Sequence, residues 1–168
     1  MHRNTIEHGT FADEESYRLF RSTGAYLIPT ILAGVSVAEI AADPQSFFPS
    51  SVRDRALLVG PVLIESTRRT HQAGVKIAFG SDSSVSNHGT NAREFLLLVE
   101  AGLTPLQAIQ TATVNGAENL GKSDLMGTLE PGKYADIIAI SKDPTKDISA
   151  LMDVGFVMKE GEVHKQSY

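Results

Sequence analysis

The sequence predicts an α/β protein in which helices join the strands of a parallel sheet, followed by a short region of β structure. Two successive segments, 13–31 and 50–79, share the order helix, glycine, apolar strand. Repetition of this unit is typical of parallel sheets. After residue 127, turn residues and short apolar runs replace the helical pattern. We therefore assign residues 1–122 to an α/β part and residues 123–168 to a small β part.

The first unit begins with a well-marked helix. Asp13 is a candidate N-cap, Glu14 lies in the first turn and Arg21 near the end, which is the charge order that a helix dipole favours. Gly24 is expected to end the helix. The apolar run 25–31 then predicts a buried strand.

The second unit repeats this order over a longer stretch. A helix is predicted from Ser50 or Ser51 to about Arg69, Gly74 follows it, and residues 75–79 form the next strand. Residues 34–49 lie between the two units, contain glycine and proline and show no clear period. They predict a loop, and a lid is one interpretation of it.

The remaining elements are predicted from capping and turn residues. Residues 91–101 favour a helix, and Thr104 with Gln107 forms a capping box for a further helix. Residues 135–140 favour an apolar strand. Glu160–Gly161 is placed between two short strands and predicts a hairpin turn.

Composition limits the function classes. The chain has 168 residues, of which 42% are hydrophobic and 21% charged, and its net charge is −5. This charge gives no reason to expect nucleic acid or anionic lipid as a partner, so a small-molecule or dipeptide substrate fits better. Because cysteine is absent, any metal must be held by His, Asp, Glu or a modified Lys.

Membrane insertion and secretion are not expected from the sequence. No run of about 18 apolar residues occurs, and the amino terminus lacks the apolar core of a signal peptide. We therefore expect a cytoplasmic protein without a membrane partner. The sequence does not determine whether Met1 is the true start or whether a missing upstream part carries a signal peptide.

Two side chains that can bind a metal lie next to glycine, each just after a predicted strand. Asp82 comes after Gly80 at the end of strand 75–79, and His8 precedes Gly9 after a short extended piece. In an α/β barrel the strands' carboxyl ends meet at one rim, so the two side chains could converge there. Spacing alone favours the simpler interpretation, in which both are solvated or capping residues.

Three further residues are candidates for substrate binding. His88 lies in a glycine-flanked loop after Asp82, and it is either an exposed loop residue or a substrate contact. Asn91 and Arg93 could bind a substrate carboxylate, although both also suit the start of a helix. Asp136 is interpreted as a structural partner near a turn.

Several short stretches occur in an order that is typical of one enzyme family. They are Ile6–Thr10, Gly24–Thr30, Gly80–Ser83 with His88–Asn91, Thr111–Ala117 and Gly127–Ile137. This arrangement closely resembles the carboxyl-terminal part of the amidohydrolase superfamily, in particular its imidazolonepropionase-like and Xaa-Pro dipeptidase (prolidase-like) members. The resemblance covers nearly the whole chain.

The resemblance implies the carboxyl-terminal part of a (β/α)8 metal-dependent hydrolase barrel, with strands six to eight, plus part of a small β-sandwich. By resemblance, His8 is a metal ligand or a substrate contact. Asp82 is the last-strand metal ligand and catalytic residue, which takes a proton from the attacking water and delivers it to the leaving amine. Zinc, as one or two ions, is the expected cofactor, since a divalent metal makes water acidic enough to attack near pH 7.

The departures from the family are as informative as the match. Members supply a His-x-His pair, often a Lys, and a further His from earlier strands, and this chain contains no His-x-His. We therefore expect an amidohydrolase that hydrolyses C–N bonds in a dipeptide, acyl-amino acid or cyclic amide, present here as a fragment that is inactive alone. The alternatives are a non-catalytic oligomerising barrel remnant and one half of a split enzyme. The expected partners are further copies of the chain or a missing amino-terminal barrel half.

Overall fold

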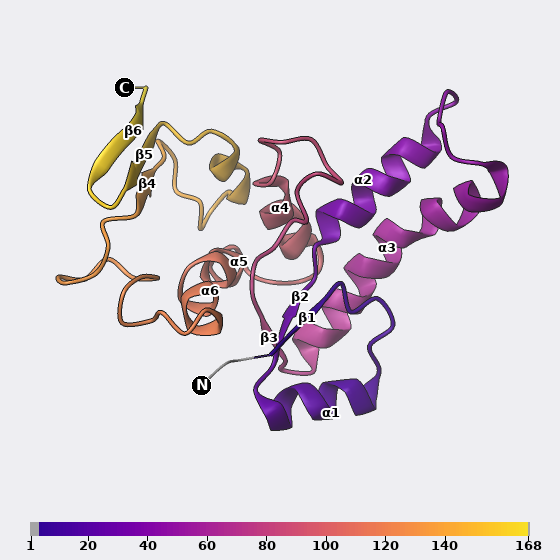
Figure 1. Cartoon of the computed structure of the whole chain (residues 1–168), viewed down its shortest axis with the longest axis horizontal. Coiled ribbons are helices and arrows are strands. Elements are labelled where there is room, and N and C mark those ends of the chain that lie inside the picture. The colour runs from indigo at the N-terminus through magenta and orange to yellow at the C-terminus, as the bar shows by residue number, and fades with distance from the viewer. Residues whose placement is uncertain (1–3, 168) are drawn as a thin grey trace.

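Three parallel strands lie at the centre of the α/β part in the computed structural model, which describes residues 4–167 (Figure 1). They are β1 (Thr5–Glu7), β2 (Tyr26–Ile28) and β3 (Lys76–Ile77), in the order β1-β2-β3. The parallel sheet predicted from the sequence is confirmed. The sheet is open, with β1 and β3 at its edges, so the described residues contain no closed barrel.

The first helix, α1 (Glu14–Thr23), begins and ends as its sequence predicts. The Asp13 carboxylate accepts a hydrogen bond from the Ser16 backbone N–H at 2.9 Å. Gly24 ends the helix with φ of 69°, a conformation that glycine adopts with little strain. Helix α1 therefore returns the chain to the sheet beside β1.

The prediction of a loop at residues 34–49 is wrong for most of its length, because α2 covers Ile31–Ala42. Glu39 is its only charged residue, so α2 lacks the polar face by which an amphipathic helix is recognised. Figure 1 shows α2 beside the long α3 (Ser50–Gln72). The glycine at position 34 is a packing residue, since an added Cβ would lie 2.5 Å from Leu63 Cδ1 on α3.

Three helices follow the sheet: α4 (Arg93–Glu100), α5 (Pro105–Ala112) and α6 (Val114–Asn119). The capping box predicted for Thr104 and Gln107 is confirmed, with both of its hydrogen bonds present at the start of α5.

Helices α5 and α6 also hold the outer side of β3. The Phe79 backbone N–H donates to the Thr111 carbonyl at 3.0 Å, and the Asn115 side chain donates to the Ile77 carbonyl at 2.8 Å. The chain that leads from β3 to Asp82 is therefore fixed by these two helices.

A second sheet contains β4 (Ile137–Ala139), β5 (Phe156–Lys159) and β6 (Glu162–Gln166), all antiparallel. The predicted hairpin turn between β5 and β6 is confirmed, and both turn residues have positive φ. The Asp136 carboxylate accepts hydrogen bonds from the Glu160 backbone N–H and from Lys159 Nζ, which confirms its structural role.

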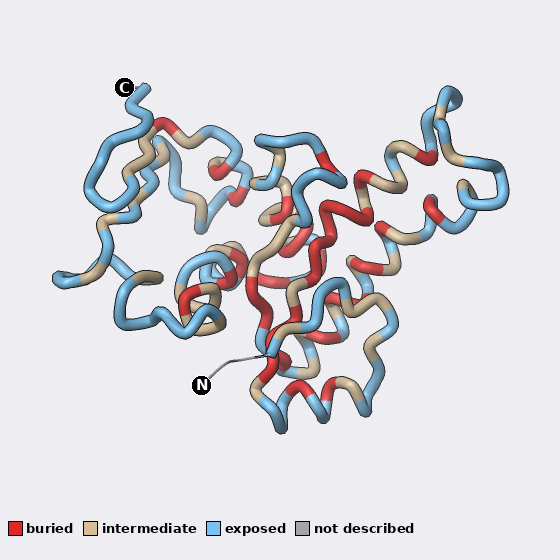
Figure 2. Tube along the Cα trace, viewed as in Figure 1, coloured by how far each residue is buried: buried red, intermediate tan, exposed pale blue. Residues whose placement is uncertain are grey.

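The main core lies between the parallel sheet and the helices (Figure 2). It contains Leu27 of β2, Leu63 of α3 and Leu98 of α4. A short 3-10 helix, η1 (Ile148–Met152), which the sequence did not predict, adds Ile148 and Leu151 to the same core. Across residues 4–167, no helix combines the length and apolar character required to cross a membrane.

Candidate functional site

Three residues with unusual backbone conformation lie at the carboxyl ends of the parallel strands. His8 follows β1, Thr30 follows β2 and Asp82 lies beyond β3, and their φ values are 65°, 48° and 50°. Positive φ is costly for residues other than glycine, and such residues cluster at functional sites. Because the strands are parallel, all three residues lie at the same end of the sheet, the end at which the strands' carboxyl ends meet.

The contacts of His8 determine which imidazole nitrogen is available to a ligand. His8 Nδ1 lies 2.6 Å from Thr30 Oγ1. The Thr30 hydroxyl donates its single proton to the Pro29 carbonyl at 2.8 Å, so Thr30 Oγ1 acts as the acceptor for His8. In the neutral imidazole, this contact places the proton on Nδ1 and leaves a lone pair on Nε2. The side chain is exposed, so Nε2 is accessible to a metal ion or a substrate.

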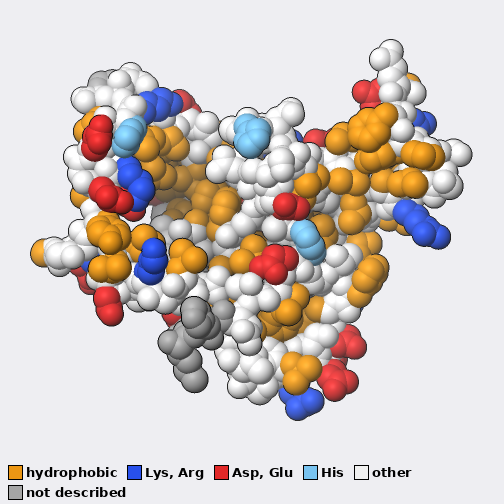
Figure 3. Space-filling view, in the orientation of Figure 1, with side chains coloured by type: hydrophobic (Ala, Val, Ile, Leu, Met, Phe, Trp, Pro, Cys, Tyr) orange, Lys and Arg blue, Asp and Glu red, His pale blue; other side chains and the backbone are white. Residues whose placement is uncertain are grey.

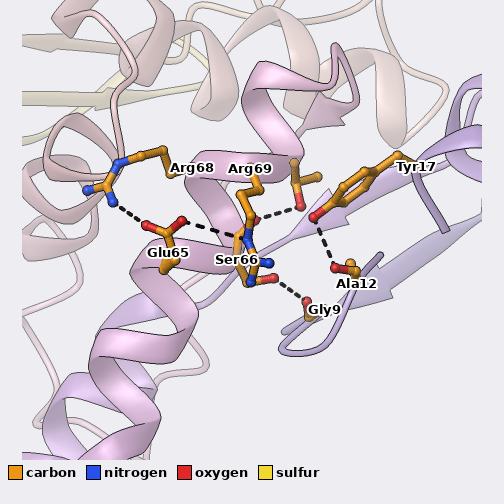
Figure 4. A network of polar contacts seen from close by, with 8 residues as sticks. Gly9, Ala12, Tyr17, Glu65, Ser66, Arg68 and Arg69 are labelled. Atoms are coloured by element: carbon orange, nitrogen blue, oxygen red, sulfur yellow. Dashed lines mark hydrogen bonds and ion pairs between the residues drawn. The ribbon is translucent and has the colours of Figure 1, made fainter. Parts of the chain in front are cut away.

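The loop that carries His8 is fastened to α3. The buried Ser66 hydroxyl donates to the Gly9 carbonyl at 2.6 Å, and the Tyr17 hydroxyl donates to the Ala12 carbonyl at 2.9 Å (Figure 4). Gly9 also packs closely on β2, because an added Cβ would lie 2.5 Å from Leu27 Cδ1. The position of His8 is therefore set by contacts on both sides of its loop.

Asp82 lies in an exposed loop beyond β3. The backbone before it passes so close to β2 that a side chain at Gly80 would meet Ile28 Cγ2. The Asp82 carbonyl accepts a hydrogen bond from the Val85 N–H at 3.2 Å. Within residues 4–167, its carboxylate makes no hydrogen bond or ion pair. Among the described residues, no group therefore competes with a ligand for this carboxylate.

The three predicted substrate-binding residues lie in the segment that leads from Asp82 into α4. His88 and Asn91 are exposed. Arg93 lies at the start of α4, and its Nη2 is 2.6 Å from Oε1 of Glu39 on α2. This hydrogen bond to Glu39 raises the pKa of Arg93. Arg93 thus has a structural partner, and substrate binding by these three residues stays a prediction.

Glu94 is a residue that the sequence reasoning missed. Its side chain is fully buried, and its two oxygens accept hydrogen bonds from the backbone N–H groups of Ile31 at 3.0 Å and Leu32 at 2.7 Å. Burial raises the pKa of Glu94 to about 7, against the two hydrogen bonds, which lower it. The available signal was helical spacing, since positions 94, 97, 98 and 101 form one buried stripe of α4 and its end.

His8 and Asp82 are the right types of ligand for zinc, but two ligands are too few. An imidazole Nε2 and a carboxylate are ordinary zinc ligands, and catalytic zinc sites use three protein ligands. Among residues 4–167, no group of three or more His, Cys, Asp or Glu side chains could hold a metal ion. His8 and Asp82 therefore do not make a complete zinc site by themselves.

A cavity elsewhere in the molecule is lined by none of these residues. It has a volume of about 600 Å³ and is lined by α5, α6 and the segment that leads into β4. Its one acidic residue is Asp136, whose carboxylate is occupied by Glu160 and Lys159. The free polar groups of His8 and Asp82 indicate the functional edge more strongly than this cavity does.

The chain has a relative that matches almost its whole length in sequence. It is 33% identical to an ochratoxinase of Aspergillus niger, and the match covers 96% of this chain and 34% of the ochratoxinase.

Solved structures extend this similarity to the fold. A Xaa-Pro dipeptidase crystallised with methionine in its active site matches with a TM-score of 0.91 and 44% identity, over 96% of this chain and 40% of the dipeptidase. A prolidase in complex with N-methylphosphonate-L-proline matches with a TM-score of 0.85 and 29% identity, over 97% of this chain and 40% of the prolidase. The chain thus spans well under half the length of these relatives.

A family model also matches nearly the whole chain. The model described as the amidohydrolase family aligns with residues 2–164, which include His8, Asp82 and most of the antiparallel sheet. The resemblance noted in the sequence is therefore confirmed, and the chain belongs to the amidohydrolase family.

Proposed function

We propose that this chain supplies part of the active site of a metal-dependent hydrolase that cleaves C–N bonds in dipeptides or acyl-amino acids. The observation that carries the proposal is a pair of metal-binding groups at the carboxyl ends of the parallel strands, His8 Nε2 and the Asp82 carboxylate, neither of which has a hydrogen-bond partner within residues 4–167. The similarity to a Xaa-Pro dipeptidase and to a prolidase supports the substrate class.

Each residue has a distinct role in this proposal. His8 would bind the metal ion through Nε2, and its contact with Thr30 orients the imidazole ring. Asp82 accepts a proton from the attacking water while the water oxygen bonds to the carbonyl carbon. Asp82 then returns this proton to the nitrogen as the C–N bond breaks, so that a carboxylate is regenerated. A bound zinc ion would supply Lewis acidity that lowers the pKa of the attacking water.

The described residues do not supply the remaining ligands. Residues 4–167 offer no third His, Cys, Asp or Glu at the site, and the chain covers only 40% of the Xaa-Pro dipeptidase that it resembles. We infer that the partner is the rest of such a protein, which would pair with the open sheet. His88, Asn91 and Arg93 are the residues proposed to contact the substrate, and Arg93 would have to leave Glu39 to do so.

A chimera tests this proposal without knowledge of any upstream sequence. Residues 2–164 replace the corresponding segment of the Xaa-Pro dipeptidase, and hydrolysis of Xaa-Pro dipeptides and zinc content are measured. We expect an active, zinc-containing chimera. Asp82→Asn is expected to lower kcat by about 100-fold or more, because the proton transfer is lost.

Matched substitutions separate a catalytic effect from a general one. Asp54→Asn on α3 and His164→Asn on β6 change the same residue types at exposed positions. We expect these controls to retain activity, whereas His8→Asn loses zinc. A folded chimera in which Asp82→Asn is as active as Asp54→Asn would contradict the role of Asp82.

A second candidate, a non-catalytic module that associates with itself, is favoured by the open edge of β1. Ile6 in this strand is 50% exposed, and an unpaired strand edge is a template for further pairing. An inactive chimera without zinc, together with stable self-association of the chain, would favour this candidate over the hydrolase.

A further inference from the structure

The amino-terminal end of α2 is held by a side chain from another helix. The first N–H groups of a helix have no partner within the helix, and Thr30, at the N-cap position of α2, makes no side-chain cap. Glu94 of α4 takes this place, since one oxygen accepts from Ile31 N–H and the other from Leu32 N–H. The two helices are thus joined by a buried carboxyl group at the residues that follow Thr30.

This contact fixes the conformation of Thr30. Thr30 has φ of 48°, a left-handed conformation that is strained for a β-branched residue and persists only where the surroundings enforce it. Its side chain is 97% buried, and the next two backbone N–H groups are those bound by Glu94. A shift of the α2 terminus would therefore turn the Thr30 hydroxyl away from its present position.

The direction of the Thr30 hydroxyl in turn determines which nitrogen of the neutral His8 imidazole carries the proton. Because this hydroxyl donates to Pro29, it can only accept from His8, and the imidazole proton is kept on Nδ1. The free Nε2 is the atom that a ligand would use. Glu94, Thr30 and His8 therefore form a series of contacts that runs from α4 to the edge of the sheet.

We propose that Glu94 is a positioning residue, which holds the first turn of α2 so that Thr30 orients the His8 imidazole with Nε2 free. Its importance for hydrolysis rests on the proposed function, but its effect on the imidazole does not. Both can therefore be tested separately.

Imidazole nitrogen NMR of the chain labelled with ¹⁵N-histidine measures this effect directly. The spectra are recorded at pH 8, and the His8 signals are assigned with His8→Asn. We expect the wild-type chain to show His8 protonated on Nδ1. Glu94→Gln keeps the shape of the side chain but places an amide N–H against a backbone N–H, so we expect loss of the Nδ1–H signature.

Further variants distinguish positioning from general destabilisation. Glu100→Gln changes an exposed residue of the same helix and is expected to leave the His8 spectrum unchanged. Thr30→Val removes the acceptor hydroxyl and should lose the Nδ1–H signature by itself, whereas Thr30→Ser retains it. Adding Glu94→Gln to Thr30→Val should produce no further change at His8, because both act through the same contact.

The outcome that overturns the proposal is a folded Glu94→Gln chain with the wild-type His8 spectrum. Should this variant fail to fold, Glu94→Asp provides the same test, because its shorter side chain retains the charge but cannot reach both N–H groups. The chimera assay is independent of this result. An inactive chimera with a Glu94-dependent His8 spectrum would contradict the hydrolase proposal alone.

Discussion

Burial gives Glu94 properties that a surface glutamate does not have. Its carboxyl group is 0% exposed, and its pKa is raised from 4.5 to about 7 by burial. The folded chain therefore holds this proton more tightly than the unfolded chain does. The contribution of this group to stability is complete below pH 4.5 and is lost as the pH rises through 7.

The pH dependence of unfolding checks this prediction. The free energy of unfolding is measured by urea titration between pH 4.5 and 8 for the wild-type chain and for Glu94→Gln. The wild-type value should fall relative to the variant by up to about 1.4 kcal/mol per pH unit. Groups with lowered pKa, such as Asp13 and Asp136, are present in both chains and cancel in the difference. Parallel pH curves would show that Glu94 is not titrating in this range.

At the scale of elements, the helices after the sheet determine how β3 reaches Asp82. Helix α5 begins at the capping box of Thr104 and ends where the Thr111 carbonyl accepts from Phe79. Thr104 caps the start of α5, and the end of α5 holds the chain that leads from β3 to Asp82. A change at Thr104 is therefore expected to weaken the contact that holds the Asp82 loop.

Thr104→Ala is therefore expected to destabilise the chain by about 1 kcal/mol, because the N–H groups at the start of α5 lose their cap. Chemical unfolding measures this loss. Gln110→Ala is the control, since Gln110 is exposed on the same helix and is expected to change stability by less than about 0.5 kcal/mol. Equal stability of the two variants would mean that the cap contributes nothing measurable.

At the scale of the whole molecule, the main feature is apolar surface that is exposed to solvent. A groove of about 490 Å³ lies beside β1 and includes the exposed side chains of Ile6, Phe11 and Leu19. Figure 3 shows further hydrophobic side chains over the α2–α3 hairpin and in the hollow beside the antiparallel sheet. Apolar surface next to an unpaired strand edge favours association.

We expect the isolated chain to form oligomers, with a mass by light scattering that increases with concentration. Ile6→Lys adds a charge at the open edge and should shift the population towards monomers. Leu106→Lys makes the same chemical change at a similarly exposed position on α5 and should not. A wild-type chain that stays monomeric at about 100 μM would contradict the prediction.

Local chemistry explains why much of the fold was predictable. The caps at Asp13, Gly24 and Thr104 depend on neighbours within a few residues, and each was confirmed. Helix α2 was missed because it is apolar on all sides and carries Gly34 where it packs on α3, so it lacks the polar face of an amphipathic helix. The antiparallel hairpin was predictable because its turn conformation is set by Glu160 and Gly161 themselves.

The sequence by itself determined the parallel and antiparallel sheets, the main helix caps, the family and the two candidate ligands, His8 and Asp82, because these depend on short motifs. Only the tertiary structure decided which groups these ligands contact. Thr30 lies 22 residues from His8, and Glu94 lies 63 residues from Ile31, so no local pattern reveals these contacts. Long-range packing brings α4 against the start of α2, and this buried contact supports the edge of the sheet where the proposed site lies.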